Sequence, residues 1–205
     1  MGNLRIGLVT SGRGTMLRYM LQGCADGSVP GSVVAVASNI DCQALVVARE
    51  AEVPYIVNHA AEHYGSRADR DTEMGAELLK AGVDLVVVAG YTEPLAEGLL
   101  DLFPDRAISM YPALLPAFGE LDEAIGPALD YGVKVIGMTF HFRAPDSVSA
   151  GPIIAQEPIP VDVDDSVETV MPRLVDIEIR MLFDILRAFA EGRISRVGNK
   201  VTVHD

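Results

Sequence analysis

Short apolar runs alternate with segments of helical periodicity along the first 90 residues of the chain. The apolar runs are rich in β-branched residues and are bounded by glycine or polar clusters, which is typical of buried strands. These runs cover residues 4–10, 32–38, 54–57 and 83–89. The periodic segments between them predict helices over residues 17–24, 44–51 and 67–81. Continuous apolar strands separated by helices indicate an α/β fold with a doubly wound, mostly parallel, Rossmann-like sheet.

The pattern changes after Pro116. Residues 124–131 predict a helix, and residues 135–142 and 153–160 predict two strands of alternating polarity, which indicates a mixed C-terminal extension of the sheet. Ser166 has the side chain of an N-cap, so a long C-terminal helix is expected from there to a stop at Gly192. Because no linker, repeat or low-complexity segment interrupts the 205 residues, the chain is expected to form a single domain over residues 1–205.

Composition and charge narrow the class of partner. The chain is 49% hydrophobic and 22% charged, with a formal net charge of −13 and a pI near 4.6. An acidic protein lacks the basic face that nucleic acid requires, and no apolar run reaches the roughly 18 residues of a membrane span. We therefore expect a cytoplasmic protein that binds a small molecule, with neither nucleic acid nor membrane as partner. A homodimer is left open, and Cys24 and Cys42 are expected to be reduced thiols without a metal.

Two local features point to chemistry. The sequence Ser11-Gly12-Arg13-Gly14-Thr15 follows the first strand, and its glycines would let the backbone approach an anion at the amino terminus of a helix. The alternative is a tight turn that binds nothing. Ser109 and Tyr111 stand two residues apart near the end of a strand, which places both side chains on one face of the sheet.

Four separated segments, taken together and in order, resemble the folate-dependent formyltransferases, most of all those that act on glycinamide ribonucleotide. The segments cover nearly the whole chain and are the glycine loop, Ala89-Gly90-Tyr91, Ser109-Met110-Tyr111-Pro112-Ala113-Leu114-Leu115-Pro116, and Thr139-Phe140-His141-Phe142 with the following Gly151-Pro152-Ile153-Ile154-Ala155-Gln156. The resemblance implies a formyltransferase fold and transfer of a one-carbon unit from 10-formyltetrahydrofolate or a related folate, without a metal.

The resemblance also implies binding residues. Substrate phosphate and sugar are expected at Gly12, Arg13, Gly14, Thr15 and Glu178, although Glu178 would otherwise be an ordinary solvated helix residue. The folate is expected at Gly90, Tyr91, Leu95, Arg67 and Asp146. The chain departs from the family here, because Thr92-Glu93-Pro94-Leu95 replaces M-R-I-L and the loop before Gly151 is one residue longer. A reshaped pocket is therefore expected.

The reacting groups depart further from the family pattern. Ser109 and Tyr111 stand where the family has asparagine and histidine, and Ser149 stands where it has an aspartate. Hydroxyls can donate hydrogen bonds to an oxyanion, but none of the three is a base at neutral pH. The loss of one oxyanion donor costs on the order of 10²–10³ in rate, and the loss of general acid–base help roughly 10²–10⁴.

Three hypotheses follow. The chain is a diverged formyltransferase that acts on a small anionic amine, a ligand-binding relative without turnover, or an enzyme of another reaction class that uses the same cleft. Tyr111 is expected in a pocket lined by Gly90, Tyr91, Ser109, His141 and Ser149, with its hydroxyl directed at Ser149 or His141. His141 would pair with Tyr111 as acid and base, or else be satisfied by backbone in a packed strand. The pattern H-x-x-E-H at residues 59–63 also occurs in zinc proteases.

Overall fold

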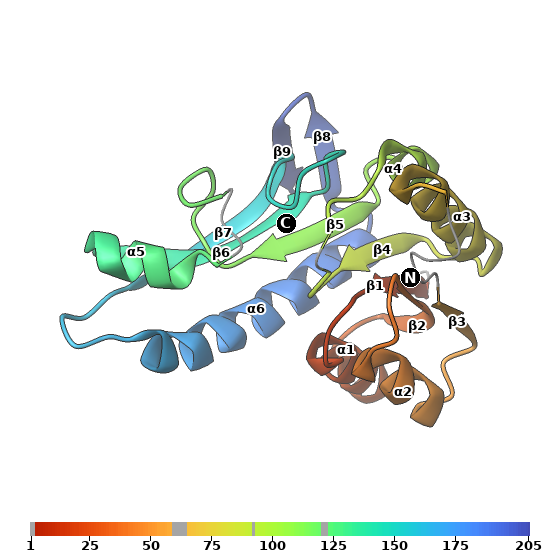
Figure 1. Ribbon diagram of the computed structural model, residues 1–205, viewed down its shortest axis with the longest axis horizontal. Helices are drawn as coiled ribbons and strands as arrows, with labels where there is room; N and C mark the ends of the chain where they lie inside the picture. The colour runs from red at the N-terminus through yellow and green to blue at the C-terminus, as the bar shows by residue number, and fades with distance from the viewer. Residues whose placement is uncertain (1–2, 59–64, 92, 120–122) are drawn as a thin grey trace.

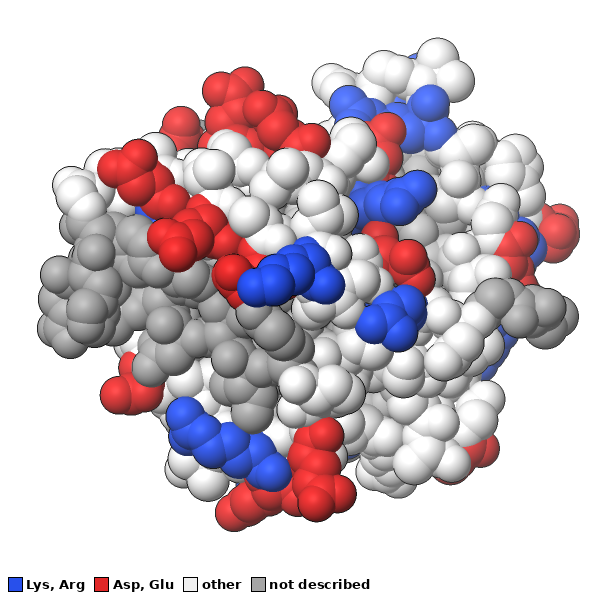
Figure 2. All heavy atoms as spheres, turned by 90° about the vertical axis from the view of Figure 1, so that its right-hand side faces the viewer, with Lys and Arg blue, Asp and Glu red and all other residues white. Residues whose placement is uncertain are grey.

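The protein is described from a computed structural model over residues 3–58, 65–91, 93–119 and 123–205 (Figure 1). The H-x-x-E-H pattern at residues 59–63 lies outside the described residues. In the described part of the chain, no helix is long and apolar enough to cross a membrane. Lys and Arg side chains stand as separate spots among acidic and uncharged side chains on the face shown in Figure 2.

A seven-stranded sheet forms the centre of the molecule, with the order β3-β2-β1-β4-β5-β6-β7. Neighbouring strands are parallel from β3 across to β5, and β6 and β7 are added antiparallel. The expected mostly parallel sheet with a mixed extension is therefore confirmed. The strands are β1 (Leu4–Val9), β2 (Gly31–Ser38), β3 (Tyr55–Asn58), β4 (Leu85–Val88), β5 (Ala107–Tyr111), β6 (Val135–Phe142) and β7 (Ile153–Pro160).

Helices cover both faces of the sheet because its strands are apolar on both faces. One core contains apolar residues of α1, α2, α5 and α6, and the opposite core contains those of α3 and α4. The helices are α1 (Thr15–Asp26), α2 (Gln43–Glu50), α3 (Arg67–Lys80), α4 (Glu97–Leu102), α5 (Ile125–Tyr131) and α6 (Val167–Ala190). The long C-terminal helix begins after Ser166 as expected, where the Ser166 N–H donates to Thr169 Oγ1 at 2.9 Å.

The sequence interpretation missed α4 and a small two-stranded hairpin, β8 (Ile194–Val197) with β9 (Lys200–Val203). Helix α4 has only six residues, too few for a helical period to stand out. The hairpin did carry a local signal, because Gly198-Asn199 between two short runs is a two-residue turn sequence, and Gly198 has a φ of 61°.

The order of the strands also places the ligand region. The chain runs outward from β1 to β2 and β3 on one side, and from β4 to β5 on the other. In open α/β sheets, ligands bind beyond the carboxyl ends of the strands at such a switch point. The loops after β1 and β4 meet there, since the Ser11 N–H donates to the Gly90 carbonyl at 2.9 Å.

Candidate functional site

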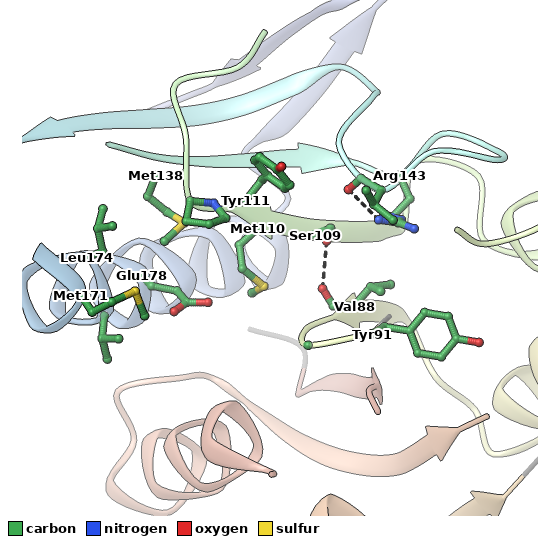
Figure 3. Close-up of a pocket in the computed structure, with 14 residues that line it drawn as sticks. Val88, Tyr91, Ser109, Met110, Tyr111, Met138, Arg143, Met171, Leu174 and Glu178 are labelled. Atoms are coloured by element: carbon green, nitrogen blue, oxygen red, sulfur yellow. Dashed lines mark hydrogen bonds between the residues drawn. The ribbon is translucent and has the colours of Figure 1, made fainter. Parts of the chain in front are cut away.

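A cavity of about 670 Å³ opens beyond the ends of β4 and β5 (Figure 3). Its walls come from the ends of β4, β5 and β6, the loop after β6, and the first half of α6. Ser109, Tyr111, Gly90, Tyr91 and Glu178 all line it. The structure thus brings together five of the residues singled out in the sequence. Tyr111 lines the cavity as expected, although it is only 8% exposed. Its hydroxyl donates to the Phe118 carbonyl, which corrects the expectation that it is directed at Ser149 or His141.

A second hollow of about 450 Å³ adjoins this cavity. It is lined by residues 12–15, called the anion loop below, and it shares Gly90, Met171, Val175 and Glu178 with the first cavity. The two hollows form one continuous cleft along α6. A ligand that spans the cleft would contact the anion loop at one end and the strand-end residues at the other.

The anion loop has the backbone of a helix-start anion site. Helix α1 begins at Thr15, and no side chain caps it. Gly14 has a φ of 80°, and a Cβ on it would lie 3.0 Å from Ala44 Cα, so glycine is required there. The first amides of α1 therefore face the hollow without intrahelical acceptors, beside the exposed side chains of Arg13 and Thr15.

Glu178 lies where the two hollows meet. It points from α6 into the space between that helix and the ends of β4 and β5 (Figure 3). Within the described residues, no hydrogen bond or ion pair to its carboxyl group is found. Burial without a compensating partner raises the pKa of Glu178 to about 7. The carboxylate is therefore available to a ligand, and it is not the solvated helix residue of the alternative interpretation.

The three hydroxyls at the replaced positions are already engaged. Each donates its single proton to a main-chain carbonyl, since a carbonyl oxygen can only accept. The pairs are Ser109 with Val88 at 3.0 Å, Tyr111 with Phe118 at 3.1 Å, and Ser149 with Gly119. The expected oxyanion site from Ser109 and Tyr111 is thus not preformed. Either hydroxyl would have to turn before it could donate to a ligand.

His141 does not form the expected acid–base pair with Tyr111. The His141 side chain is fully buried, and β5–β6 register sets it opposite Ser109. Its Nδ1 donates to the Phe142 carbonyl at 2.9 Å, and its Nε2 has no hydrogen-bond partner in the described residues. Burial lowers the pKa of His141 to about 4, so the ring is neutral. Neither His141 nor Ser149 lines the cavity, which corrects that part of the expectation.

The residues expected to bind folate divide into three groups. Gly90, with a φ of 61°, and Tyr91 line the cavity. Leu95 is fully buried in the core beside α3 and α4, and its carbonyl accepts from the Asp146 N–H at 2.9 Å. Leu95 is not among the residues that line the cavity, and a contact between its main chain and folate stays a prediction. Arg67 and Asp146 form an exposed ion pair, which ties the start of α3 to the loop after β6.

Sequence reasoning missed two groups of polar residues around the cleft. Arg143 lines the cavity from the end of β6, although nothing in its sequence context sets it apart. A hydrogen-bonded chain also joins the loops after β1, β2 and β4 through buried Arg70. Its links are Ser11 to Asn39 at 2.7 Å, Asn39 to Glu93 at 2.9 Å, Arg70 to Glu93 at 2.7 Å, and Arg70 to Asp71 at 2.9 Å. This chain fixes the relative positions of the loops that border the cleft.

Sequence similarity to known proteins identifies the family to which this chain belongs. The sequence profile described as formyl transferase matches residues 4–186. The chain is a formyl transferase family member. It is 38% identical to the phosphoribosylglycinamide formyltransferase of Mycobacterium tuberculosis, over 97% of this chain and 94% of that protein. The resemblance stated from the motifs is therefore confirmed, and the relative from Mycobacterium tuberculosis is named as a transferase.

Solved structures of related proteins have the same fold as this formyl transferase. Glycinamide ribonucleotide transformylase 1 from Symbiobacterium toebii superposes with a TM-score of 0.90 at 41% identity, over 99% of this chain and 95% of that one. A formyltetrahydrofolate deformylase from Pseudomonas syringae superposes with a TM-score of 0.84 at 26% identity, over all of this chain and 67% of that one. Relatives of this fold thus include proteins named for formyl transfer and one named for removal of the formyl group.

Proposed function

We propose that this protein transfers a formyl group from a reduced folate, 10-formyltetrahydrofolate or a close analogue, to a small phosphorylated amine of the phosphoribosylglycinamide class. The observation that carries the proposal is the continuous cleft, which joins a helix-start anion loop to the strand-end cavity past Glu178. The names of the relatives, which act on phosphoribosylglycinamide, support the same substrate class.

The described residues suit the two ends of such an amine. Its phosphate would bind the first amides of α1, where the helix dipole and Arg13 both favour negative charge. The carboxylate of Glu178 would accept hydrogen bonds from hydroxyl or amine groups in the middle of the cleft. The amine nitrogen would then lie near Ser109 and Tyr111, opposite the formyl carbon it attacks.

The formyl donor would occupy the cavity between Gly90, Tyr91 and the loop after β6. We propose that Arg67 and Asp146 at its rim contact the outer part of the folate, and that Leu95 contributes only by shaping the loop behind Tyr91. No group at the replaced positions accepts a proton at neutral pH, because Ser109, Tyr111 and Ser149 carry hydroxyls. We therefore propose transfer at a rate well below that of a chain with asparagine, histidine and aspartate at these positions.

The test is a direct assay of the purified protein with 10-formyltetrahydrofolate and phosphoribosylglycinamide, followed through the absorbance of the deformylated folate. Formation of the formylated amine at a rate reduced by about 10²-fold or more is expected, since one oxyanion donor alone contributes that much. Complementation of a purine-requiring strain gives the second measurement, and growth equal to that with an authentic enzyme would contradict the proposed slow rate. If neither ligand binds in calorimetry, the proposed substrate class is wrong.

A further inference from the structure

Four buried side-chain polar atoms in the described part of the chain have no hydrogen-bond partner, and they belong to only three residues. The atoms are Tyr91 Oη, His141 Nε2, and Nε and Nη2 of Arg143. Buried polar groups are nearly always paired, so a cluster of exceptions marks a place where a partner is missing. Tyr91 and Arg143 line the main cavity, and His141 lies opposite Ser109 in the sheet.

Arg143 is the charged member of this cluster. Its main-chain N–H donates to the Ala107 carbonyl at 2.8 Å, which fixes the residue just beyond the end of β6. Its side chain is only 9% exposed, and a single hydrogen bond, from Nη1 to the Val148 carbonyl at 2.7 Å, holds the guanidinium. The two remaining nitrogens, Nε and Nη2, share one edge of the planar group. That edge presents two parallel N–H bonds, the geometry that carboxylates occupy.

No described carboxylate neutralises this guanidinium. Asp71 is the acidic group that acts on Arg143 electrostatically, but its oxygens are already bonded to Arg70 at 2.9 Å and to the Ala96 N–H at 2.8 Å. Burial lowers the pKa of Arg143 to about 10, which still leaves it protonated at neutral pH. A buried charge without a counter-charge destabilises the protein. An anion that reached the guanidinium would supply that counter-charge, and it would not have to displace a described carboxylate.

We propose that the Nε–Nη2 edge of Arg143 is a carboxylate-binding subsite at the end of the cavity that lies away from Glu178. Figure 3 shows Arg143 and Glu178 on opposite sides of the cavity, so a bound carboxylate is kept apart from that acidic group. The edge itself is buried in this structure, so the proposal requires the side chain to turn about its single hydrogen bond and present Nε and Nη2 to the cavity.

A carboxylate fits this edge better than a phosphate does. The subsite offers one positive charge and two parallel donors, whereas a phosphate carries more charge and more acceptor oxygens. The anion loop at the other end of the cleft offers several amides in a row and suits the phosphate. The subsite is independent of the proposed formyl transfer, because carboxylate binding is measured without folate or amine.

Formate is the probe, because it is the smallest carboxylate and enters without other contacts. Calorimetric titration and thermal shift with sodium formate, against sodium chloride at the same ionic strength, should show saturable binding with a Kd on the order of 1 mM, the limit for three non-hydrogen atoms. Arg143→Met, which keeps the apolar stem, should lose at least tenfold in affinity. Arg143→Lys, which keeps the charge but not the two-pronged edge, should also lose affinity.

Arg13→Met is the matched control, because it removes the guanidinium of the anion loop and leaves the cavity intact. Formate binding that is lost in Arg13→Met but kept in Arg143→Met would overturn the proposal by placing the anion on the other loop. Equal formate affinity in Arg143→Lys and in the unchanged protein would overturn the two-pronged assignment. If Arg143→Met fails to fold, Arg143→Lys still tests whether formate binds to the guanidinium edge. A crystal structure in formate should show the anion on Nε and Nη2, and only water there would refute the subsite.

Discussion

Replacement of the Glu178 carboxyl by an amide should stabilise the protein at alkaline pH and leave it unchanged in acid. Glu178 is half-buried in the cleft, and its carboxyl group makes no hydrogen bond or ion pair with the described residues. Ionisation of such a group in the folded state is unfavourable, whereas the unfolded chain ionises it freely in water. Glu178→Gln keeps the shape of the side chain and removes the ionisation.

The magnitude follows from the pKa. Burial raises the pKa of Glu178 from 4.5 to about 7, and a shift of that size corresponds to an upper bound of about 3 kcal/mol. Because the folded pKa is the higher one, stability is fully present below pH 4.5 and is lost progressively up to pH 7. Above pH 7 the cost is constant. The free energy of unfolding of Glu178→Gln should therefore exceed that of the unchanged protein by roughly 2–3 kcal/mol at pH 8.5, and by less than about 1 kcal/mol at pH 4.5.

Urea unfolding of both proteins at the two pH values measures this difference directly. Asp176→Asn is the matched control, because Asp176 is an exposed carboxylate on the same helix, and its replacement should change stability by no more than about 0.5 kcal/mol. A Glu178→Gln variant that is equally stable, or less stable, at pH 8.5 would refute the argument that the cleft leaves this carboxylate unpaired. The same variant should bind the amine substrate less tightly, so the stabilisation would come at the expense of binding.

Three further predictions test other parts of the site. The triple change Ser109→Asn, Tyr111→His, Ser149→Asp should raise formyl transfer at least about tenfold, and no rise in a variant that still binds folate would contradict the assignment of the reacting positions. Arg70→Met should lower the free energy of unfolding by roughly 3–5 kcal/mol because it leaves the fully buried Asp71 without its guanidinium, and urea unfolding that shows under 1 kcal/mol would disprove this role. Crystals grown in phosphate should show the anion at the first amides of α1, and a loop without density would argue against the anion site.

Local patterns along the chain were enough to predict most of the helices and strands and the class of fold. Apolar runs such as residues 83–89 are local signals, and their alternation with helical segments decides how the sheet is covered. The spacing of Ser109 and Tyr111 also predicted their common face, because side chains alternate along a strand. The glycines of the anion loop indicated a close approach of backbone to ligand. Each of these inferences depends on residues that are neighbours in the chain.

The role of each polar group, in contrast, depends on contacts between segments that are distant in the chain. The proton of Ser109 goes to Val88 on the adjacent strand, and Leu95 lies in the core and not in the cavity. Arg143 forms no ion pair with a described carboxylate, and Asp71, which acts on it electrostatically from a distant part of the chain, is already bonded to Arg70. Hydrogen bonding, burial and pKa depend on which distant segments surround a group, and no local pattern of residues specifies that. The sequence could therefore name the candidate groups, but only the packed fold shows which of them remain free for a ligand.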